Sequence, residues 1–340
     1  MDHRLLGRTG VHVSPLCLGC MMFGGKTSEE DSCAIIDRAL DAGVNFLDTA
    51  DVYSRGESER VTGLALKRNG RRDRVVLATK FHGAMADDDP NAAGSSRRHI
   101  MRAVEDSLRR LQTDHIDLYQ LHRPRSDTPI DETLRAIDDL VRQGKVRYFG
   151  TSTFAAFQVV ESLWASEVLG LNRTVCEQPP YNLLDRRIER ELVPVAQQYG
   201  LALIPWSPLA AGLLTGKYTR DRRAPDQRPA DTRFAGKDNT WVQRNFTDRC
   251  FDVVETLVDM AAAKSCTPSQ LALAWVMHQP AITSPIIGPR TMDQLIDNLG
   301  ALEVTISDED RKRLDNVSPP GRAIASYYDA DWHQSRFRWR

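Results

Sequence analysis

The chain has 340 residues, of which 41% are hydrophobic and 27% charged, the proportions of a globular protein with a large core. Its 45 basic and 46 acidic side chains give a formal net charge of -1, so no electric field favours nucleic acid or an anionic membrane. The opening MDHRLLGRTG lacks an apolar segment after its charges, and no apolar run approaches the roughly 20 residues of a membrane helix. We therefore expect a cytoplasmic protein that binds neither nucleic acid nor membrane.

Strand-like and helix-like segments alternate along the chain. A hairpin over RLLGRTGVHVS, with its turn between Gly7 and Gly10, precedes a strand from Leu16 to Gly19. Further strands are predicted at 44–47, 75–79, 116–121, 146–150, 174–178, 201–205 and 282–287. Helical periodicity predicts helices at 29–42, 58–68, 97–111, 131–143, 154–168, 188–199, 246–264, 268–278 and 291–299.

Eight such strand-helix units with nearly continuous apolar strands predict an α/β fold, a closed parallel (β/α)8 TIM barrel formed by residues 1–340 as a single domain. A doubly wound sheet is the alternative fold. Such a sheet normally binds a dinucleotide through GxGxxG after an early strand, and the sequence contains no such match.

Two segments fall outside the repeat. Residues 212–244, rich in Gly, Pro, Arg and Asp, form a long loop after the seventh strand, and loops of that length are usually functional or disordered. Extra helices complete the second half of the chain. The tail from Ser318 carries dense aromatic residues and is expected to dock on a surface; these are Tyr327, Tyr328, Trp332, Phe337 and Trp339.

The six cysteines are too scattered for a disulfide framework. Cys17 and Cys20 form a CxxC, which could be half of a metal site or a redox pair. No second CxxC or nearby CxH accompanies it, and the pair lies within the apolar run SPLCLGCMMFG. We interpret the pair as part of a packed strand and predict no metal site.

Polar residues stand where predicted strands end, which is where an α/β barrel builds its active site. Asp48 ends the second strand of the predicted barrel, Lys80 the third and His122 the fourth, and Tyr53 follows Asp48 by five residues. An ammonium beside a phenol favours the phenolate and lowers its pKa, while a carboxylate keeps that ammonium charged. Together with a histidine that orients a carbonyl, this set suits protonation of an oxygen that gains negative charge as hydride arrives at carbon.

Each of these residues also has a structural interpretation. Asp48 and Lys80 could form an ion pair with no chemical role, Tyr53 could be a packed aromatic, and His122 could cap a turn. Their joint placement on three consecutive strands favours the functional interpretation.

The sequence motifs also match a known family in order and over almost the whole chain. They are LGRTGVHVSPLCLGCMMFG, GVNFLDTADVYSRGESE, ATKF, DLYQLHRP, GKVRYFGTS, CEQPPYNLL, IPWSPLAAGLLTGKY and IIGPRTMDQLIDNL. With them the chain resembles bacterial aldo-keto reductases, which are similar also to the β-subunits of voltage-gated potassium channels. The family tetrad falls on Asp48, Tyr53, Lys80 and His122, with Tyr53 as proton donor. The channel subunits lack the histidine, so the resemblance implies an NAD(P)H-dependent oxidoreductase that reduces carbonyls.

The resemblance further implies NADPH bound in extended form across the barrel mouth. Gly19, Cys20 and Met21 would line the end of the first strand beside Asp48, with Ser152, Thr153 and Gln178 at the nicotinamide carboxamide. Trp206 would stack on the nicotinamide ring, and Ser207, Pro208, Leu209 and Lys217 would follow the pyrophosphate. The adenosine 2′-phosphate and adenine would meet Gly288, Arg290, Gln294, Asp297 and Asn298. GPRTMDQL suits a phosphate, because it combines a glycine turn, an arginine and a helix N-terminus.

Three functions are compatible with the sequence. The first is an NADPH-dependent carbonyl reductase, for which small aldehydes are the first substrates to consider. The second is a cofactor-binding, redox-sensing regulatory subunit with little turnover, and the third a lyase that uses Lys80 as a Schiff-base nucleophile. We expect a small-molecule carbonyl substrate and a monomer or small homo-oligomer.

Overall fold

The computed structural model of the protein describes residues 1–125 and 127–325. The chain divides into two compact units. Unit 1 comprises Met1–Pro179, Val195–Ile204 and Ala281–Ile296, and unit 2 comprises Pro180–Pro194, Pro205–Pro280 and the chain from Asp297 onward. The aromatic residues of the predicted tail, Tyr327, Tyr328, Trp332, Phe337 and Trp339, lie outside the described residues.

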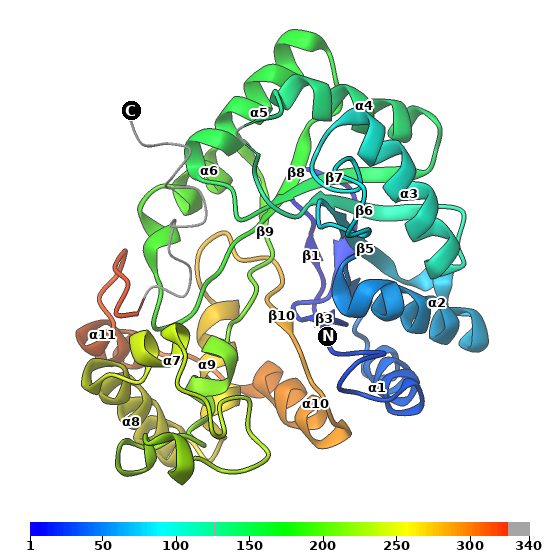
Figure 1. The fold of residues 1–340 in the computed structure, drawn as a ribbon. Helices are drawn as coiled ribbons and strands as arrows, with labels where there is room; N and C mark the ends of the chain where they lie inside the picture. Colours follow the sequence, from blue (N-terminus) through cyan, green and yellow to red (C-terminus); the bar gives the residue numbers. More distant parts are fainter. Residues whose placement is uncertain (126, 326–340) are drawn as a thin grey trace. The chain divides into compact units, whose positions relative to one another are not determined.

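Unit 1 contains an eight-stranded parallel sheet with the order β10-β3-β4-β5-β6-β7-β8-β9 (Figure 1). Its strands are β3 (Cys17–Gly19), β4 (Phe46–Asp48), β5 (Val76–Phe81), β6 (Ile116–Leu121), β7 (Val146–Ser152), β8 (Thr174–Gln178), β9 (Ala202–Leu203) and β10 (Ile286–Ile287). The two ends of this order meet, because Leu203 donates to the Ala281 carbonyl at 3.4 Å and accepts from the Thr283 N–H at 2.8 Å. The predicted (β/α)8 barrel fold is confirmed, and the doubly wound alternative is wrong.

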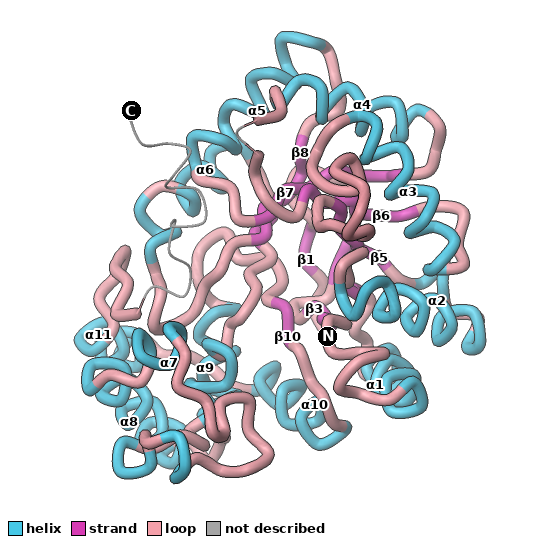
Figure 2. Tube along the Cα trace, viewed as in Figure 1, coloured by secondary structure: helices cyan, strands magenta, loops and turns pink. Residues whose placement is uncertain are grey.

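Helices connect the strands of unit 1 (Figure 2). They are α1 (Glu29–Asp41), α2 (Glu57–Asn69), α3 (Arg97–Leu111), α4 (Ile130–Arg142) and α5 (Ala156–Leu169). Hydroxyl caps start two of them: Ser28 accepts from the Asp31 N–H and Ser96 from the His99 N–H. Helices α2 and α5 end at Gly70 and Gly170, whose left-handed backbone favours glycine.

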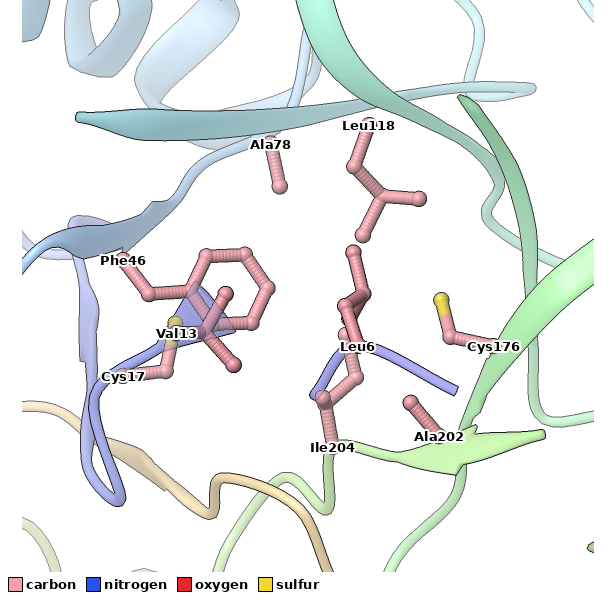
Figure 3. Packing of buried hydrophobic residues seen from close by; sticks show 9 residues of the cluster. All are labelled: Leu6, Val13, Cys17, Phe46, Ala78, Leu118, Cys176, Ala202 and Ile204. Carbon is pink, nitrogen blue, oxygen red and sulfur yellow. The ribbon is translucent and has the colours of Figure 1, made fainter. Parts of the chain in front are cut away.

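The predicted N-terminal hairpin consists of β1 (Arg4–Leu5) and β2 (His12–Val13), paired antiparallel. Leu6, which follows β1, is fully buried in an apolar cluster with residues of six barrel strands or their direct continuations (Figure 3). The cluster consists of Leu6, Val13, Cys17, Phe46, Ala78, Leu118, Cys176, Ala202 and Ile204. Cys17 therefore packs in β3, as the sequence predicted, while Cys20 is buried just after the end of that strand.

The single helix predicted over 188–199 is wrong. A 3-10 turn (Arg187–Arg190) is followed by α6 (Leu192–Tyr199), and Pro194 lies in the first turn of that helix. Proline lacks an N–H and is tolerated only near a helix start, so the chain begins a new helix here. The helix α10 (Met292–Leu299) agrees with the prediction.

Unit 2 contains the helices α7 (Thr240–Asn245), α8 (Asp248–Ala263), α9 (Pro268–Met277) and α11 (Asp308–Val317). The long loop 212–244 is folded by short 3-10 turns, by α7 and by aromatic packing. Phe234 and Trp241 stack with ring centroids 4.3 Å apart, and Phe246 packs edge-on against both. Across the described part of the chain, no helix is long and apolar enough to cross a membrane.

Candidate active site

Three neighbouring strands bring the predicted polar residues to one end of the barrel. In a strand every second side chain points to the same face, and Phe46, Ala78 and Leu118 point into the barrel core (Figure 3). Two residues further along the same strands come Asp48, Lys80 and Gln120, and His122 comes two residues after Gln120. The carboxyl ends of β4, β5 and β6 therefore share a polar layer above an apolar one.

Asp48 and Lys80 form a buried ion pair. Lys80 Nζ donates to Asp48 Oδ1 at 2.5 Å and to the Thr49 carbonyl at 2.8 Å, and both side chains are buried. Burial lowers the pKa of Lys80, but the charge of Asp48 and the contact with Tyr53 raise it more, so the net pKa lies above its usual value. Lys80 is thus held as an ammonium at neutral pH.

Tyr53 lies directly on this pair. Lys80 Nζ donates to Tyr53 Oη at 3.3 Å and stands 5.0 Å from the centre of the ring. The backbone after Tyr53 turns sharply, since Ser54 and Arg55 have φ of 49° and 53° and Gly56 has 94°, before α2 begins at Glu57. This turn leads the chain from Tyr53 into α2, and the phenol itself lies against Lys80 near the end of β5.

The protonation state of Tyr53 corrects one expectation. Burial raises the pKa of the phenol, Lys80 lowers it, and the net pKa is raised. The predicted influence of the ammonium is present, but desolvation outweighs it. Tyr53 is therefore protonated at neutral pH, which is the state that a proton donor needs.

His122 completes the group. Its ring meets the ring of Tyr53 edge-on, with centroids 5.7 Å apart, and its backbone N–H donates to the Phe81 carbonyl at 3.0 Å. Burial, then the positive charges of Lys80 and Arg123, hold the pKa of His122 well below its usual range. The imidazole is thus neutral and offers one ring N–H to a ligand oxygen. The structure brings all four predicted residues together.

Most of the predicted nicotinamide contacts also lie in unit 1. Ser152 Oγ donates to the Gln178 carbonyl at 3.0 Å, while the Gln178 side chain donates to Asp48 Oδ2 at 2.9 Å. Thr153 has φ of 64° and accepts a hydrogen bond from Arg123. Both N–H groups of the Gln178 side-chain amide are used within the barrel, so the side-chain oxygen Oε1 is the group left for a ligand.

The first strand and the last one contribute further predicted positions in unit 1. A side chain at Gly19 would come within 2.6 Å of Ile286, so glycine is needed there. The Cys20 N–H donates to the Asp48 carbonyl at 2.8 Å, and Met21 is exposed. At the end of β10, Gly288 borders open space, and the Arg290 N–H donates to Gln294 Oε1 at 2.9 Å.

The remaining predicted cofactor residues belong to unit 2. Within that unit, Ser207 has φ of 55° and its carbonyl accepts from Asn182 at 3.1 Å; Trp206, Pro208, Leu209 and Lys217 belong to the same stretch of chain. Asn298 is buried, and the carboxylate of Asp297 is held by Thr267 at 2.8 Å and Gln270 at 3.1 Å. Asp297 thus accepts hydrogen bonds from the start of α9, which the sequence motif did not predict.

One buried residue of the polar layer was missed at the sequence level. Gln120 on β6 donates to Asp48 Oδ2 at 3.0 Å. The strand alternation from Leu118 to His122 could have identified it, because it predicts that Gln120 also points inward. In the part of the chain that the structure describes, no three His, Cys, Asp or Glu side chains are grouped as metal ligands.

The fold and this cluster define a barrel protein with a buried group of titratable side chains at the carboxyl ends of its strands. Comparison with known proteins agrees with that class. A sequence model of the "Aldo/keto reductase family" matches residues 15–319. The chain belongs to the aldo/keto reductase family, and it is an oxidoreductase of that family.

Three relatives cover nearly the whole chain. "Uncharacterized oxidoreductase YrpG" of Bacillus subtilis (strain 168) is 40% identical over 337 residues, which is 96% of this chain and 99% of the relative. Two proteins called "Probable voltage-gated potassium channel subunit beta" match 309 residues, which is 89% of this chain and 92% of each relative. That of Oryza sativa subsp. japonica is 38% identical and that of Arabidopsis thaliana 36%.

Proposed function

We propose that the protein is an NADPH-dependent reductase that converts an aldehyde or ketone to an alcohol, with Tyr53 as the general acid. The observation that carries this proposal is the hydrogen-bonded series of Asp48, Lys80 and Tyr53 beside His122 at the barrel end. A structural ion pair would not need a protonated phenol and a neutral imidazole placed on it. A proton donor next to a developing oxyanion needs both.

Each residue then has one role. Tyr53 Oη gives its proton to the carbonyl oxygen as that oxygen gains negative charge. The ammonium of Lys80, 3.3 Å away, stabilises the phenolate that remains, and Asp48 keeps this ammonium charged and in place. The neutral ring N–H of His122 holds the carbonyl oxygen toward Tyr53. NADPH, when bound, supplies the hydride that the carbonyl carbon receives.

The predicted cofactor contacts suit such a ligand. A carboxamide could donate its N–H to the side-chain oxygen Oε1 of Gln178. It could also bind the hydroxyl of Ser152, which lies on the neighbouring strand. Arg290, which precedes α10, offers a cation for the 2′-phosphate that distinguishes NADPH from NADH. We therefore propose NADPH as the cofactor, with the predicted residues of unit 2 as candidates to be tested one by one.

The decisive experiment compares wild type with Tyr53→Phe. We expect the absorbance of NADPH to fall when wild type meets a panel of reactive aldehydes and ketones. Tyr53→Phe should bind NADPH as wild type does but lose turnover by roughly 100-fold or more, because a positioned acid contributes on that order. Tyr148→Phe, in a partly buried tyrosine of β7, is the matched control and should leave turnover unchanged. Full turnover in Tyr53→Phe would rule out the mechanism.

A regulatory role is the second candidate, because two relatives bear the name of a potassium channel subunit. In that case the protein would bind NADPH and sense redox state with little turnover. Binding without turnover across the whole carbonyl panel would favour it. The lyase hypothesis loses support, since an ammonium with a raised pKa is no nucleophile.

Substrate, location and assembly complete the proposal. We propose small aldehydes first, because they make the fewest demands on a pocket. We propose a cytoplasmic location, as expected from the sequence, and cell fractionation tests it. Sedimentation measures whether the protein is a monomer or a small homo-oligomer.

A further inference from the structure

A fully buried amide lies beside the reacting groups and is used by no step of the proposed reaction. Gln120 is on the inward face of β6, one inward position beyond Leu118 of the apolar cluster. Its partners across the sheet are Lys80 of β5 and Gly150 of β7. A Cβ at Gly150 would lie 2.5 Å from Cys176 Sγ and 3.2 Å from Gln120 Cγ, so the missing side chain makes room for Gln120.

Gln120 takes part in a closed set of three hydrogen bonds. Its Nε2 donates to Asp48 Oδ2 at 3.0 Å, and Gln178 Nε2 donates to the same oxygen at 2.9 Å. Gln178 Nε2 also donates to Gln120 Oε1 at 3.1 Å. Two strands, β6 and β8, thus hold one carboxylate oxygen of β4.

The chemistry of the groups leaves no choice in the direction of these bonds. An ionised carboxylate only accepts, so the nitrogen of each amide must face Asp48. The Gln120 carbonyl then faces Gln178, whose second N–H reaches it. Turning either amide over would place an oxygen against the carboxylate oxygen.

The other oxygen of Asp48 holds Lys80. With Oδ1 on the ammonium at 2.5 Å and Oδ2 on the two amides, the carboxylate cannot rotate without leaving buried polar groups unpaired. The position of Lys80, and hence of its 3.3 Å contact with Tyr53, depends on this arrangement.

We propose that Gln120 is a positioning residue of the reaction: it fixes the Asp48 carboxylate, and through it the Lys80 ammonium beside the proton donor Tyr53. This inference rests on the proposed function. The side-chain hydrogen bonds of Gln120 go to Asp48, Gln178 and Cys176 and not to Tyr53 or His122, so it acts through Asp48. The same amide also orients Gln178, so it connects the group that holds Lys80 with the proposed carboxamide site.

Two substitutions separate hydrogen bonding from packing. Gln120→Met keeps the length of the side chain and removes its hydrogen bonds with Asp48 and Gln178. Gln120→Glu keeps the shape and returns a donor only when the new carboxyl is protonated. Cys176→Ala is the packing control: Cys176 is buried, its thiol makes only a long 4.0 Å contact to Gln120 Oε1, and no hydrogen bond joins it to the tetrad. Turnover is measured per NADPH-binding site, so incorrectly folded protein does not contribute.

We expect kcat of Gln120→Met to fall roughly tenfold or more, the loss that follows from removing one charge-assisted hydrogen bond. The KM for NADPH should change less, because the side-chain oxygen Oε1 of Gln178 is still available to the carboxamide. Gln120→Glu should resemble wild type at low pH and lose kcat at high pH, where the ionised carboxyl no longer donates and repels the Asp48 carboxylate; wild type and Cys176→Ala lack this step. Such a step cannot come from packing, and it can be measured even if Gln120→Met does not fold.

Each outcome separates this inference from the proposed function. Unchanged kcat in both Gln120 variants, or a loss in Gln120→Met without the pH step in Gln120→Glu, would overturn the positioning role. A wild type without turnover, or an active Tyr53→Phe, would overturn the proposed function before any Gln120 variant is measured, and the positioning role with it.

Discussion

At the scale of single residues, two carboxyl groups near the tetrad are fully buried: Asp51, three residues after Asp48, and Glu177 on β8 of the same barrel. Burial raises the pKa of Asp51 to about 8, and its backbone N–H donates to the Lys80 carbonyl at 3.1 Å. Burial likewise raises the pKa of Glu177 to about 8, and Glu177 accepts from the Phe154 N–H at 3.0 Å, which shapes the chain after Thr153. Both carboxyl groups therefore hold a proton in the folded protein that they lose in the unfolded one at neutral pH.

Glu177 makes folding stability depend on pH. Its pKa is about 8 when folded and 4.5 as the ordinary value, so the folded state binds the proton more tightly. The contribution of the protonated Glu177 carboxyl to the free energy of unfolding is complete below pH 4.5 and is lost as the pH rises through 8. Between these values the free energy of unfolding of wild type should fall more steeply than that of Glu177→Gln, by up to about 1.4 kcal/mol per pH unit. Urea unfolding at several pH values measures this, with exposed Glu167→Gln as control; parallel curves for wild type and Glu177→Gln would refute it.

The residue scale also shows what sequence could predict of the site. Asp48, Tyr53, Lys80 and His122 are recognisable because charged and aromatic groups at strand ends stand out from apolar runs. Gln120 is a neutral amide within such a run, and only the pairing of strands places its nitrogen against a carboxylate from 72 positions earlier. The net rise of the Tyr53 pKa was not predictable either, since the degree of burial is a property of the fold.

At the scale of elements, periodicity predicted the bounds of β6, β8 and α3 without error. The strand predicted over 282–287 shrinks to Ile286–Ile287, because an apolar run does not tell which residues pair. Helix α11 (Asp308–Val317) was not predicted, since in the described structure Leu314 is its one buried residue and the apolar stripe is missing.

Helices α2 and α3 approach each other at a glycine. A Cβ on Gly63 would lie 2.4 Å from the backbone carbon and oxygen of Leu111, the last residue of α3. Alanine usually stabilises a helix by about 1 kcal/mol relative to glycine, but the collision should cost about 1–3 kcal/mol. We therefore expect Gly63→Ala to lower the melting temperature. Gly10→Ala, where the added methyl meets nothing within 4 Å, is the control. A more stable Gly63→Ala would contradict the close approach.

At the scale of the whole molecule, the hairpin is the part of unit 1 that covers the amino end of the barrel. A Cβ at Gly7 would come within 2.6 Å of the Val175 carbonyl, at the start of β8, and Leu6 lies in the apolar cluster (Figure 3). The candidate active site and the hairpin are thus at opposite ends of the same strands. That residues 1–340 fold as one domain stays a prediction, and a single calorimetric unfolding transition would support it.

Two adjacent leucines test the contribution of the hairpin. Leu6 is 0% exposed and Leu5 is 51% exposed. Leu6→Ala should cost about 2–5 kcal/mol of folding free energy, because it leaves a cavity in the cluster. Leu5→Ala should change it by less than about 0.5 kcal/mol. Denaturant unfolding measures both. Equal effects would mean that packing of Leu6 in the apolar cluster does not stabilise the barrel.

The alternation of side chains along β5 restricts how the length of the chain can change. Thr79, between Ala78 and Lys80, points out of the barrel, where its hydroxyl donates to Glu59 of α2 at 2.6 Å. Deleting one residue within the strand would exchange these directions, sending an ammonium toward α2 and a hydroxyl toward Asp48. Insertions and deletions of single residues are therefore excluded from β4, β5 and β6, whereas the loops between elements can accept them. Related sequences should therefore differ in length in the loops and not within these strands.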